Sequence, residues 1–458
     1  MMGRALFLFT VAIAACDSPD AVTCDGETCS GHGTCVLADG VATCECDGGY
    51  SAVGLGCYAP PAGPLADLPS PAGPHIVDIM ALGDGEWLRL PDPAPDPIYG
   101  VGRGRSWGGR AFALAPELRG AFFTGEGVHA FVKPDGFGMD DIYFYDVYAN
   151  RWIAVHPGNE IAVFNQRVRD GALRIDARGQ LVDHVDQPIP LHTLIHAWSF
   201  ATYDHARRRF SWLAGDGMGR YFMPGEEQID EGLTALEAQR DAATVAEMSP
   251  WFYDVVTGRF DRQVLVGDTP AMVTNGNVNY GVFQYVPTRQ QLFYAANEGV
   301  TFYDPVGMTW LSIADQGPRP RDYDHNGTYD SARDRIYMGD GMGDPTGPLY
   351  IYDVATATWT HPPMQGEGPS SFRTSDASIM YDTVNDIVTV LHYVDEQIYT
   401  FSPATSTWSR RPFPANGPQW GYESMNAFYM PELNAYFLHL AVDSEPGGEI
   451  WVYRHATP

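Results

Sequence analysis

The chain of 458 residues contains a single lysine, Lys133, and no cysteine after Cys57. Lysine and arginine together number 28, against 57 aspartates and glutamates, and the formal net charge at pH 7 is −29. A chain so poor in basic residues lacks the positive face that nucleic-acid binding requires, which excludes this class of partner. Because no disulfide can form beyond Cys57, the rest of the chain must be held together by its hydrophobic core.

Several motifs of enzymes are also missing. The sequence has no P-loop and no G-x-S-x-G nucleophile motif, so phosphate-cradling hydrolases and serine hydrolases of those types are not expected. The repeated GDGMG at 215–219 and 339–343 lies at the predicted ends of strands and is not a phosphate cradle. His192 and His196 could present two metal ligands on one strand face, but no third is indicated. We predict no metal site and no cofactor.

The N-terminus predicts export. Residues 1–15 carry one positive residue, Arg4, and an apolar run that is too short to span a bilayer, as in a signal peptide. The following IAAC at Cys16 resembles the bacterial lipobox, which implies that Cys16 is acylated and anchors the protein in the cell envelope through a tether of residues 16–23. The alternative is an ordinary signal peptide, with Cys16 left as a spare thiol. Whether the protein faces the cell surface or the periplasm stays open.

The other six cysteines lie in the short segment 24–57, which cannot bury enough apolar surface to fold without staples. Their count alone allows fifteen pairings. The spacing C-x4-C-x5-C-x8-C-x-C-x10-C resembles an EGF-like module, and the resemblance implies the disulfides Cys24–Cys35, Cys29–Cys44 and Cys46–Cys57. A zinc site is the rival interpretation. Residues 58–74 are rich in proline and alanine and predict an extended linker that holds the next domain away from the membrane.

From residue 75 to 458 one phrase recurs, in which an aromatic residue, usually followed by Asp, precedes Trp or Phe by seven positions. The copies are Tyr145–Trp152, Tyr253–Phe260, Tyr303–Trp310, Tyr352–Trp359 and Phe401–Trp408. The last four recur about every fifty residues and follow glycine-ended β-rich runs, which resembles the kelch repeat of galactose-oxidase-like β-propellers. In that repeat, Tyr-Asp ends strand c and Trp begins strand d. A β-sandwich is the alternative, but a fixed aromatic spacing disfavours it.

The ends of this region suggest how the ring closes. The last copy reaches Tyr453 without a following Trp strand, whereas a lone strand begins at Trp87. We therefore predict an all-β, six-bladed kelch-like propeller in which the N-terminal strand completes the last blade, a Velcro closure. The predicted blades span 105–157, 192–267, 275–317, 321–366, 371–417, and 419–458 plus 82–92. The insertion 158–190 could hide a seventh, degenerate blade.

The candidate ligand site is the mouth of the central channel, where strand a of each blade begins. A second insertion, 218–248, places Ile229, Leu233 and Leu236 at helical spacing, and blade topology puts both insertions on the face of this mouth. The candidate contacts mix aromatic, amide and charged side chains, which suits a glycan or a protein partner. They are Arg105, Trp107, Arg110, His192, His196, Trp198, Asn277, Asp322, Asp324, His325, Arg373, Asp376, Trp420, Tyr422 and Glu423.

These features favour a lipid-anchored envelope protein that binds a partner, with no catalytic residue marked out. Copper radical oxidases share kelch blades but need a cysteine cross-linked to tyrosine, and no cysteine follows Cys57. One alternative is a carbohydrate-active enzyme such as a kelch-type sugar mutarotase or epimerase, which rests on analogy of fold. The other is a structural envelope protein without a discrete ligand.

Overall fold

The computed structural model describes most of the chain after the N-terminus. The described residues are 24, 27–38, 41–105, 111–125, 140–158, 160–190, 200–213, 236, 239, 249–274, 281–296, 299–320, 325–340, 349–415, 417–418, 424–442 and 445–456. They form two compact units, Met1–Pro60 and Pro61–Pro458. No helix among these residues is long and apolar enough to cross a bilayer.

The first unit is a small module built around three disulfides. Its elements are η1 (Cys29–Gly31), β1 (Gly33–Ala38), β2 (Val41–Cys46), β3 (Ser51–Val53) and β4 (Gly56–Tyr58), with β1 paired to β2 and β3 to β4. The disulfides are Cys24–Cys35, Cys29–Cys44 and Cys46–Cys57, the pairing that the resemblance implied.

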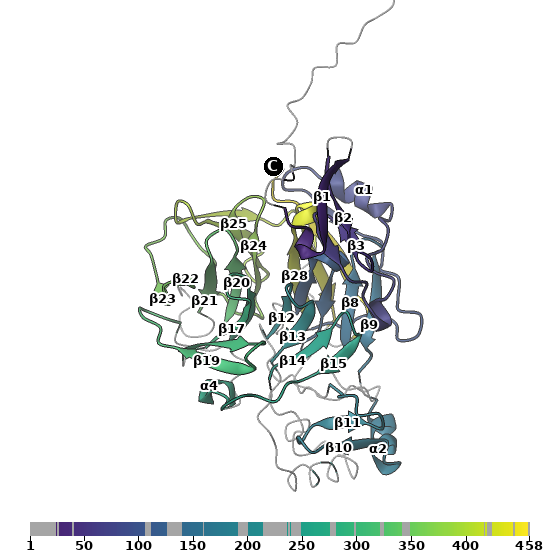
Figure 1. Ribbon diagram of the computed structural model, residues 1–458. Helices are drawn as coiled ribbons and strands as arrows, with labels where there is room; N and C mark the ends of the chain where they lie inside the picture. Colours follow the sequence, from purple (N-terminus) through teal and green to yellow (C-terminus); the bar gives the residue numbers. More distant parts are fainter. Residues whose placement is uncertain are drawn as a thin grey trace, which may run out of the picture. The chain divides into compact units, whose positions relative to one another are not determined.

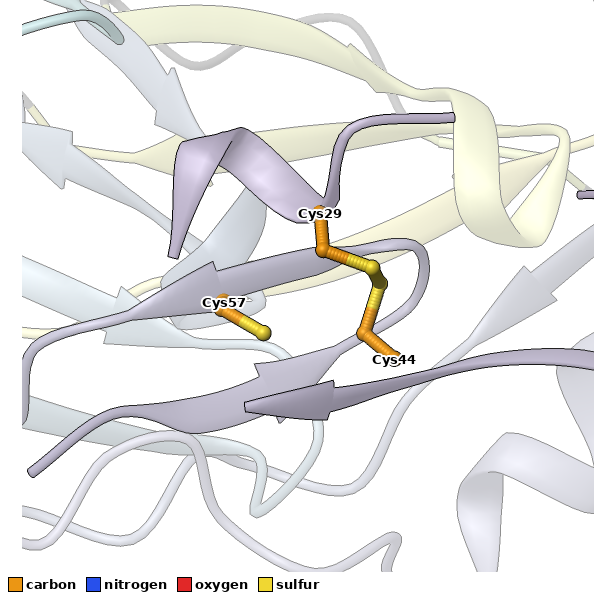
Figure 2. A group of neighbouring side chains, drawn as sticks. All are labelled: Cys29, Cys44 and Cys57. Carbon is orange, nitrogen blue, oxygen red and sulfur yellow. A yellow bond between two sulfur atoms is a disulfide. The ribbon is translucent and has the colours of Figure 1, made fainter. Parts of the chain in front are cut away.

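The sulfur atoms of Cys29, Cys44 and Cys57 lie within 4.8 Å of one another, as metal ligands would (Figure 2). All three are oxidised in disulfides, Cys57 with Cys46, and a metal site needs thiolates. The zinc alternative is therefore wrong, and these sulfurs form the core of the module.

The second unit is a six-bladed propeller, as predicted (Figure 1). Each blade is an antiparallel sheet of four strands, a to d from the inside outward. Blade 1 holds β6 (Phe112–Ala115), β7 (Gly120–Phe123), β8 (Ile142–Asp146) and β9 (Arg151–His156); blade 2 holds β12 (Ala201–Asp204), β13 (Arg209–Trp212), β14 (Trp251–Asp254) and β15 (Arg259–Asp261). Blade 3 holds β16 (Val282–Val286), β17 (Gln291–Ala296), β18 (Gly299–Asp304) and β19 (Thr309–Ile313); blade 4 holds β20 (Asn326–Asp330), β21 (Arg335–Gly339), β22 (Leu349–Asp353) and β23 (Thr358–Thr360). Blade 5 holds β24 (Ala377–Asp382), β25 (Ile387–His392), β26 (Gln397–Ser402) and β27 (Thr407–Pro412).

Blade 6 confirms the Velcro closure. It consists of β28 (Ser424–Met430), β29 (Ala435–Ala441), β30 (Glu449–Tyr453) and the N-terminal strand β5 (Trp87–Arg89). Tyr453 pairs with Trp87, and their rings stack at 4.8 Å between centroids. Each innermost strand contacts its counterpart in the next blade, and β28 contacts β6, so the ring is closed.

The recurring aromatic phrase has a structural cause at both ends. Asp254, which ends strand c of blade 2, accepts hydrogen bonds from the backbone N–H groups of Val256 (3.1 Å) and Thr257 (3.0 Å), which fixes the tight turn to strand d. Trp359, which begins strand d of blade 4, is 2 % exposed and packs in one cluster with Phe293 of blade 3. Thus Asp shapes the turn while Trp joins neighbouring blades.

The connection that leaves each blade also protects the outer edge of the next one. Gln316, after blade 3, runs parallel to strand d of blade 4, and its carbonyl accepts the backbone N–H of Trp359 at 2.7 Å. The carbonyl of Gln365 likewise accepts the backbone N–H of Trp408 in blade 5, at 2.8 Å. Gly317, which follows Gln316, has φ +94°, and a Cβ there would collide with the carbonyl oxygen of Trp359. The sequence analysis missed this Gln-Gly feature, which covers an otherwise open strand edge.

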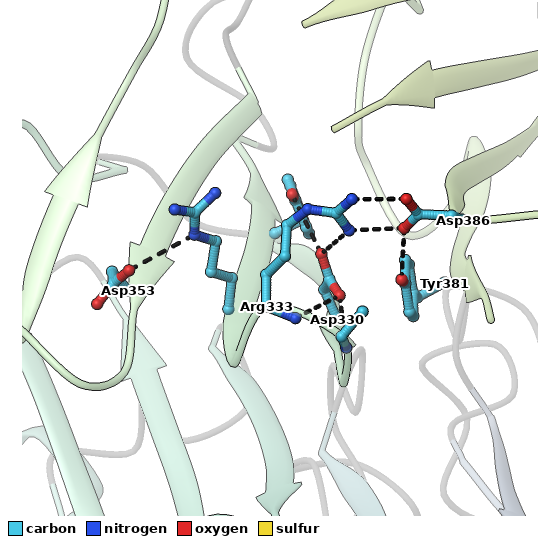
Figure 3. A network of polar contacts seen from close by, with 8 residues as sticks. Asp330, Arg333, Asp353, Tyr381 and Asp386 are labelled. Carbon is cyan, nitrogen blue, oxygen red and sulfur yellow. Dashed lines mark hydrogen bonds and ion pairs between the residues drawn. The ribbon is translucent and has the colours of Figure 1, made fainter. Parts of the chain in front are cut away.

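Polar bridges between a–b turns link all six blade junctions on one face, which we call the turn face. The bridge between blades 4 and 5 is the Arg333 guanidinium, which donates to both oxygens of Asp386 at 2.6 and 2.5 Å and to Asp330 at 3.1 Å (Figure 3). These donors hold the pKa of Asp386 below its usual range. The other junctions are Glu117–Arg208, Arg207–Gln290, Thr288–Asp334, Asp382–Tyr436 and Arg119–Glu432.

The predicted linker does not end where the sequence suggested. Residues 61–74 belong to the propeller unit and include η2 (Gly63–Leu65). Leu65 and Leu68 are buried, at 0 % and 5 %, in the core shared by blades 1 and 2, and the backbone N–H of Ala62 donates to the carbonyl of Val255 at 2.9 Å. Proline has no backbone N–H that would need a hydrogen-bond partner. Burial of the two leucines therefore determines where this segment packs. The helix α1 (His75–Met80) follows.

Candidate functional site

The b–c and d–a connections emerge on the face opposite the turn face, which we call the loop face, and the predicted mouth lies there. Of the candidate contacts, Arg105, His325, Arg373 and Asp376 are among the described residues. The others lie outside them, as does Cys16: Trp107, Arg110, His192, His196, Trp198, Asn277, Asp322, Asp324, Trp420, Tyr422 and Glu423.

Arg105 is a buried strut between blades 1 and 6. Its side chain is fully buried, forms an ion pair with Asp141, and donates to the carbonyl of Gly125 at 3.0 Å. Its backbone N–H donates to Ser424, and its carbonyl accepts from Asn426 at 2.9 Å. The guanidinium therefore fixes the loop-face ends of β7 and β8 in blade 1, and the backbone of Arg105 joins them to blade 6.

His325 has a similar position in blade 4. It is fully buried, and its Nδ1 lies 3.3 Å from the carbonyl oxygen of Gly339 and 3.9 Å from Asp340. The adjacent Asn326 donates to the carbonyl of Ala377 in blade 5 at 2.8 Å. These residues fix the start of strand a against its neighbours.

Asp376 belongs to a chain of polar contacts in blade 5, next to the partly exposed Arg373. The Ser371 hydroxyl donates to Asp376 at 2.5 Å and lies 3.4 Å from His392 Nε2. The backbone N–H of Asp395 donates to His392 Nδ1 at 3.0 Å. Sequence reasoning did not single out Ser371 or His392, because no local motif contains both.

The series of contacts among Ser371, His392 and Asp376 resembles a Ser-His-Asp triad only in its residue types. In a working triad, His Nδ1–H donates to the carboxylate and Nε2 accepts the serine proton. Here Nδ1 of His392 accepts a backbone N–H, so Nε2 carries the hydrogen and donates to Ser371. The serine proton is directed to Asp376 instead. The arrangement fixes the loop between strands and does not prepare a nucleophile.

His439 in β29 is a buried titratable group that sequence analysis also missed. Its ring lies 5.1 Å from Phe123 and 5.5 Å from Trp152, and its Nε2–H donates to the carbonyl of Gly447 at 3.1 Å. Burial lowers the pKa of His439 to about 4, the hydrogen bond to Gly447 opposes this effect, and the nearby Arg105 adds to it. The imidazole is thus neutral at pH 7.

A pH dependence of stability follows from His439. In the unfolded chain, His439 takes up a proton below about pH 6.5. In the folded protein, the same imidazole takes up its proton only near pH 4. The free energy of unfolding therefore falls by about 3 kcal/mol across this window on account of His439 alone. We expect His439→Gln, which keeps a donor for Gly447, to flatten the decline in urea-unfolding experiments between pH 7 and 4.5. The exposed His361→Gln is the control, and an unchanged slope in the His439 variant would contradict the assignment.

The insertion 158–190 is not a seventh blade in its described residues. It forms α2 (Ile161–Arg169) and a hairpin of β10 (Leu173–Ile175) and β11 (Leu181–Asp183), seen together in Figure 1. Phe164, Leu173 and Leu181 share a small core with Leu236, which is helical and fully buried. Of the predicted helix in 218–248, Ile229 and Leu233 lie outside the described residues. The contact through Leu236 shows that the two insertions meet on the loop face, as blade topology predicted.

Comparisons with known proteins add little to this geometry. No family model matches the sequence, and no curated protein matches it. A similar solved structure is that of the PQQ-bound form of aldose sugar dehydrogenase from Streptomyces coelicolor. The identity is 10 %, the TM-score is 0.40, and the match covers 81 % of this chain and 99 % of that chain. A likeness this loose carries no argument about cofactor or activity.

Proposed function

We propose that this is an exported cell-envelope protein, anchored through an acylated Cys16, whose propeller binds a glycan or a protein partner at the loop-face mouth. Three disulfides favour an oxidising compartment outside the cytosol. The lipobox resemblance at Cys16 and the kelch and EGF-like resemblances are part of this proposal. The module of residues 24–57 lies between the anchor and the propeller in the sequence.

The shared core of the two insertions is the observation that carries the binding role. A propeller needs only short connections between strands, yet this chain builds an additional body from α2, β10, β11 and Leu236 on the loop face. Structured loops on a rigid scaffold are the usual location of binding sites. The buried contacts of Arg105 and Asn326 supply that rigidity at the mouth.

Binding at the mouth is tested with Trp198→Ala and Trp420→Ala in a screen of envelope glycans and peptides. Each substitution should weaken binding at least about tenfold, because aromatic anchors dominate interface energies. His196→Ala should weaken it only modestly, and Tyr99→Ala, at an exposed tip near blade 1, is the control. Sugar turnover that disappears in His196→Ala while affinity survives would establish the enzyme alternative instead.

The anchor has its own test. Cys16→Ser should move the protein from the membrane fraction to the soluble fraction, because the acyl chains supply most of the membrane affinity. Fractionation followed by mass spectrometry of the N-terminal peptide measures both the location and the modification. A Cys16→Ser protein that still sediments with membranes would contradict lipid anchoring and leave the binding test unaffected.

A further inference from the structure

A pocket of about 1090 Å³ lies between blades 4 and 5, near the loop-face ends of their strands. Blade 4 contributes Tyr350 from β22, blade 5 contributes β26 and β27, and the connection 361–372 completes the wall. The turn that carries Asp395 forms another side. The pocket belongs to neither the predicted mouth nor the insertions.

Aromatic rings line this pocket. Phe372, Tyr399 and Trp408 come from one core cluster and are almost fully buried, so their positions are fixed by packing. Tyr350 is partly exposed, and its ring lies 5.5 Å from that of the exposed His361. The pocket therefore combines a rigid aromatic interior with an aromatic entrance.

Asp395 is the polar group that stands out in this aromatic surrounding. Its side chain is 20 % exposed. It accepts hydrogen bonds from the backbone N–H of Ser370 at 3.1 Å, the Ser370 hydroxyl at 2.7 Å and the Tyr399 hydroxyl at 2.8 Å. Burial alone would raise the pKa of Asp395, but these donors outweigh it and hold the pKa below its usual range. The carboxylate is ionised at neutral pH.

The pocket holds one permanent cation, Arg410, which pairs with Glu367, another residue of its lining, at 2.8 Å. Within the described part of the chain, no lysine or arginine lies within ion-pair distance of Asp395 itself. His392 Nδ1 is 3.4 Å away, but it accepts a backbone N–H, and burial lowers the pKa of His392, so the ring is neutral.

We propose that the pocket between blades 4 and 5 binds a cationic side chain, guanidinium or ammonium, from a basic segment of a partner protein. An ionised carboxylate in a pocket that is partly lined by aromatic rings is an arrangement that recognises cations. The net charge of −29 attracts basic partners to the whole protein, and Asp395 gives this attraction a specific place. A neutral glycan would contact the rings but leave the charge of Asp395 uncompensated.

Two synthetic peptides test the proposal by calorimetry on the full-length protein. One is an acetylated, amidated peptide of alternating glycine and arginine, and the other has citrulline, a neutral isostere, in place of every arginine. The arginine peptide should bind at least tenfold more tightly at low salt, and Asp395→Asn should remove most of this difference. Equal affinities for the two peptides, or no binding of either, would overturn the proposal.

The matched control is Asp353→Asn. Asp353 is a carboxylate of comparable exposure, 29 %, in blade 4 but outside the pocket, so its removal should leave affinity unchanged. Equal losses in the two variants would reduce the effect to overall charge and overturn the site. Tyr350→Ala at the entrance should weaken the arginine peptide several-fold, and it serves as the test should Asp395→Asn fail to fold.

The two sites can be tested apart. Trp198→Ala and Trp420→Ala should not change the affinity for the arginine peptide, because the pocket does not include the mouth. A neutral oligosaccharide that binds the unmodified protein, loses binding in Tyr350→Ala and displaces the arginine peptide would show a glycan site instead. Either proposal can therefore fail without the other.

Discussion

Arg105→Met is expected to lower the free energy of unfolding by about 3–5 kcal/mol, the cost typical of removing one partner from a buried ion pair. The substitution keeps the length of the side chain but leaves Asp141, itself 2 % exposed, as an unpaired buried charge. It also removes the donor to the carbonyl of Gly125. Urea unfolding followed by circular dichroism measures the loss.

The same substitution on the turn face supplies the comparison. Arg333 pairs with Asp386, but the two side chains are 24 % and 45 % exposed, so solvent screens the interaction. Arg333 also pairs with the buried Asp330, which keeps the backbone N–H groups of residues 332 and 333 as donors in the variant. Arg333→Met should therefore cost less than Arg105→Met, about 1–2 kcal/mol. Equal losses in the two variants would mean that Arg105 is not the strut that its burial indicates. Adding Asp141→Asn to Arg105→Met should recover part of the loss, since it removes the stranded charge.

The parts of the fold that sequence predicted correctly are those encoded by local, repeated physics. Asp254 fixes a turn by accepting the backbone N–H groups two and three residues after it. Trp359, near the start of strand d, is buried against the neighbouring blade. The same turn is made by Asp146, Asp304 and Asp353 in blades 1, 3 and 4, so blade number and ring closure could be read from spacing. The disulfides followed from a resemblance in cysteine spacing and not from these short-range contacts.

The site could be predicted only in outline, because what decides it is long-range. Arg105 was expected at the start of a strand like the other candidates, yet it precedes β6 by several residues and contacts Asp141 and Asn426, the latter from the far end of the chain. Nothing in the local sequence separates such an inward strut from an outward ligand contact. Asp395 shows the converse, since its partners Ser370 and Tyr399 are polar residues of ordinary appearance until the fold brings them to one pocket.

The linker was misjudged for a related reason. Composition rich in proline and alanine predicts an extended spacer, but residues 61–74 include the short helix η2 and belong to the propeller unit. Leu65 and Leu68 are two apolar residues in that segment, and each finds a place in the core between blades 1 and 2. Two leucines create no periodic pattern, so only the tertiary structure reveals that the segment is part of the propeller.

Three N-terminal truncations should therefore differ in stability. A chain that begins at Pro61 keeps the whole second unit and should melt like the intact propeller. A chain that begins at His75 loses the burial of Leu65 and Leu68, about 1.5–3 kcal/mol for each, as well as the hydrogen bond from Ser70 to Asp146 at 2.6 Å. A linker over residues 58–74, as the sequence predicts, would instead make this truncation neutral.

A chain that begins at Asp92 should be affected most. It loses β5, so β30 becomes an open edge with unpaired backbone groups, and Tyr453 loses the ring of Trp87. The ring then has no closing strand between its first and last blades, and we expect either aggregation or a melting temperature far below that of the other two chains. Thermal melts followed by near-UV circular dichroism distinguish the three. Identical melting of all three would refute the Velcro closure, whereas identical melting of the first two alone would refute the docking of residues 61–74.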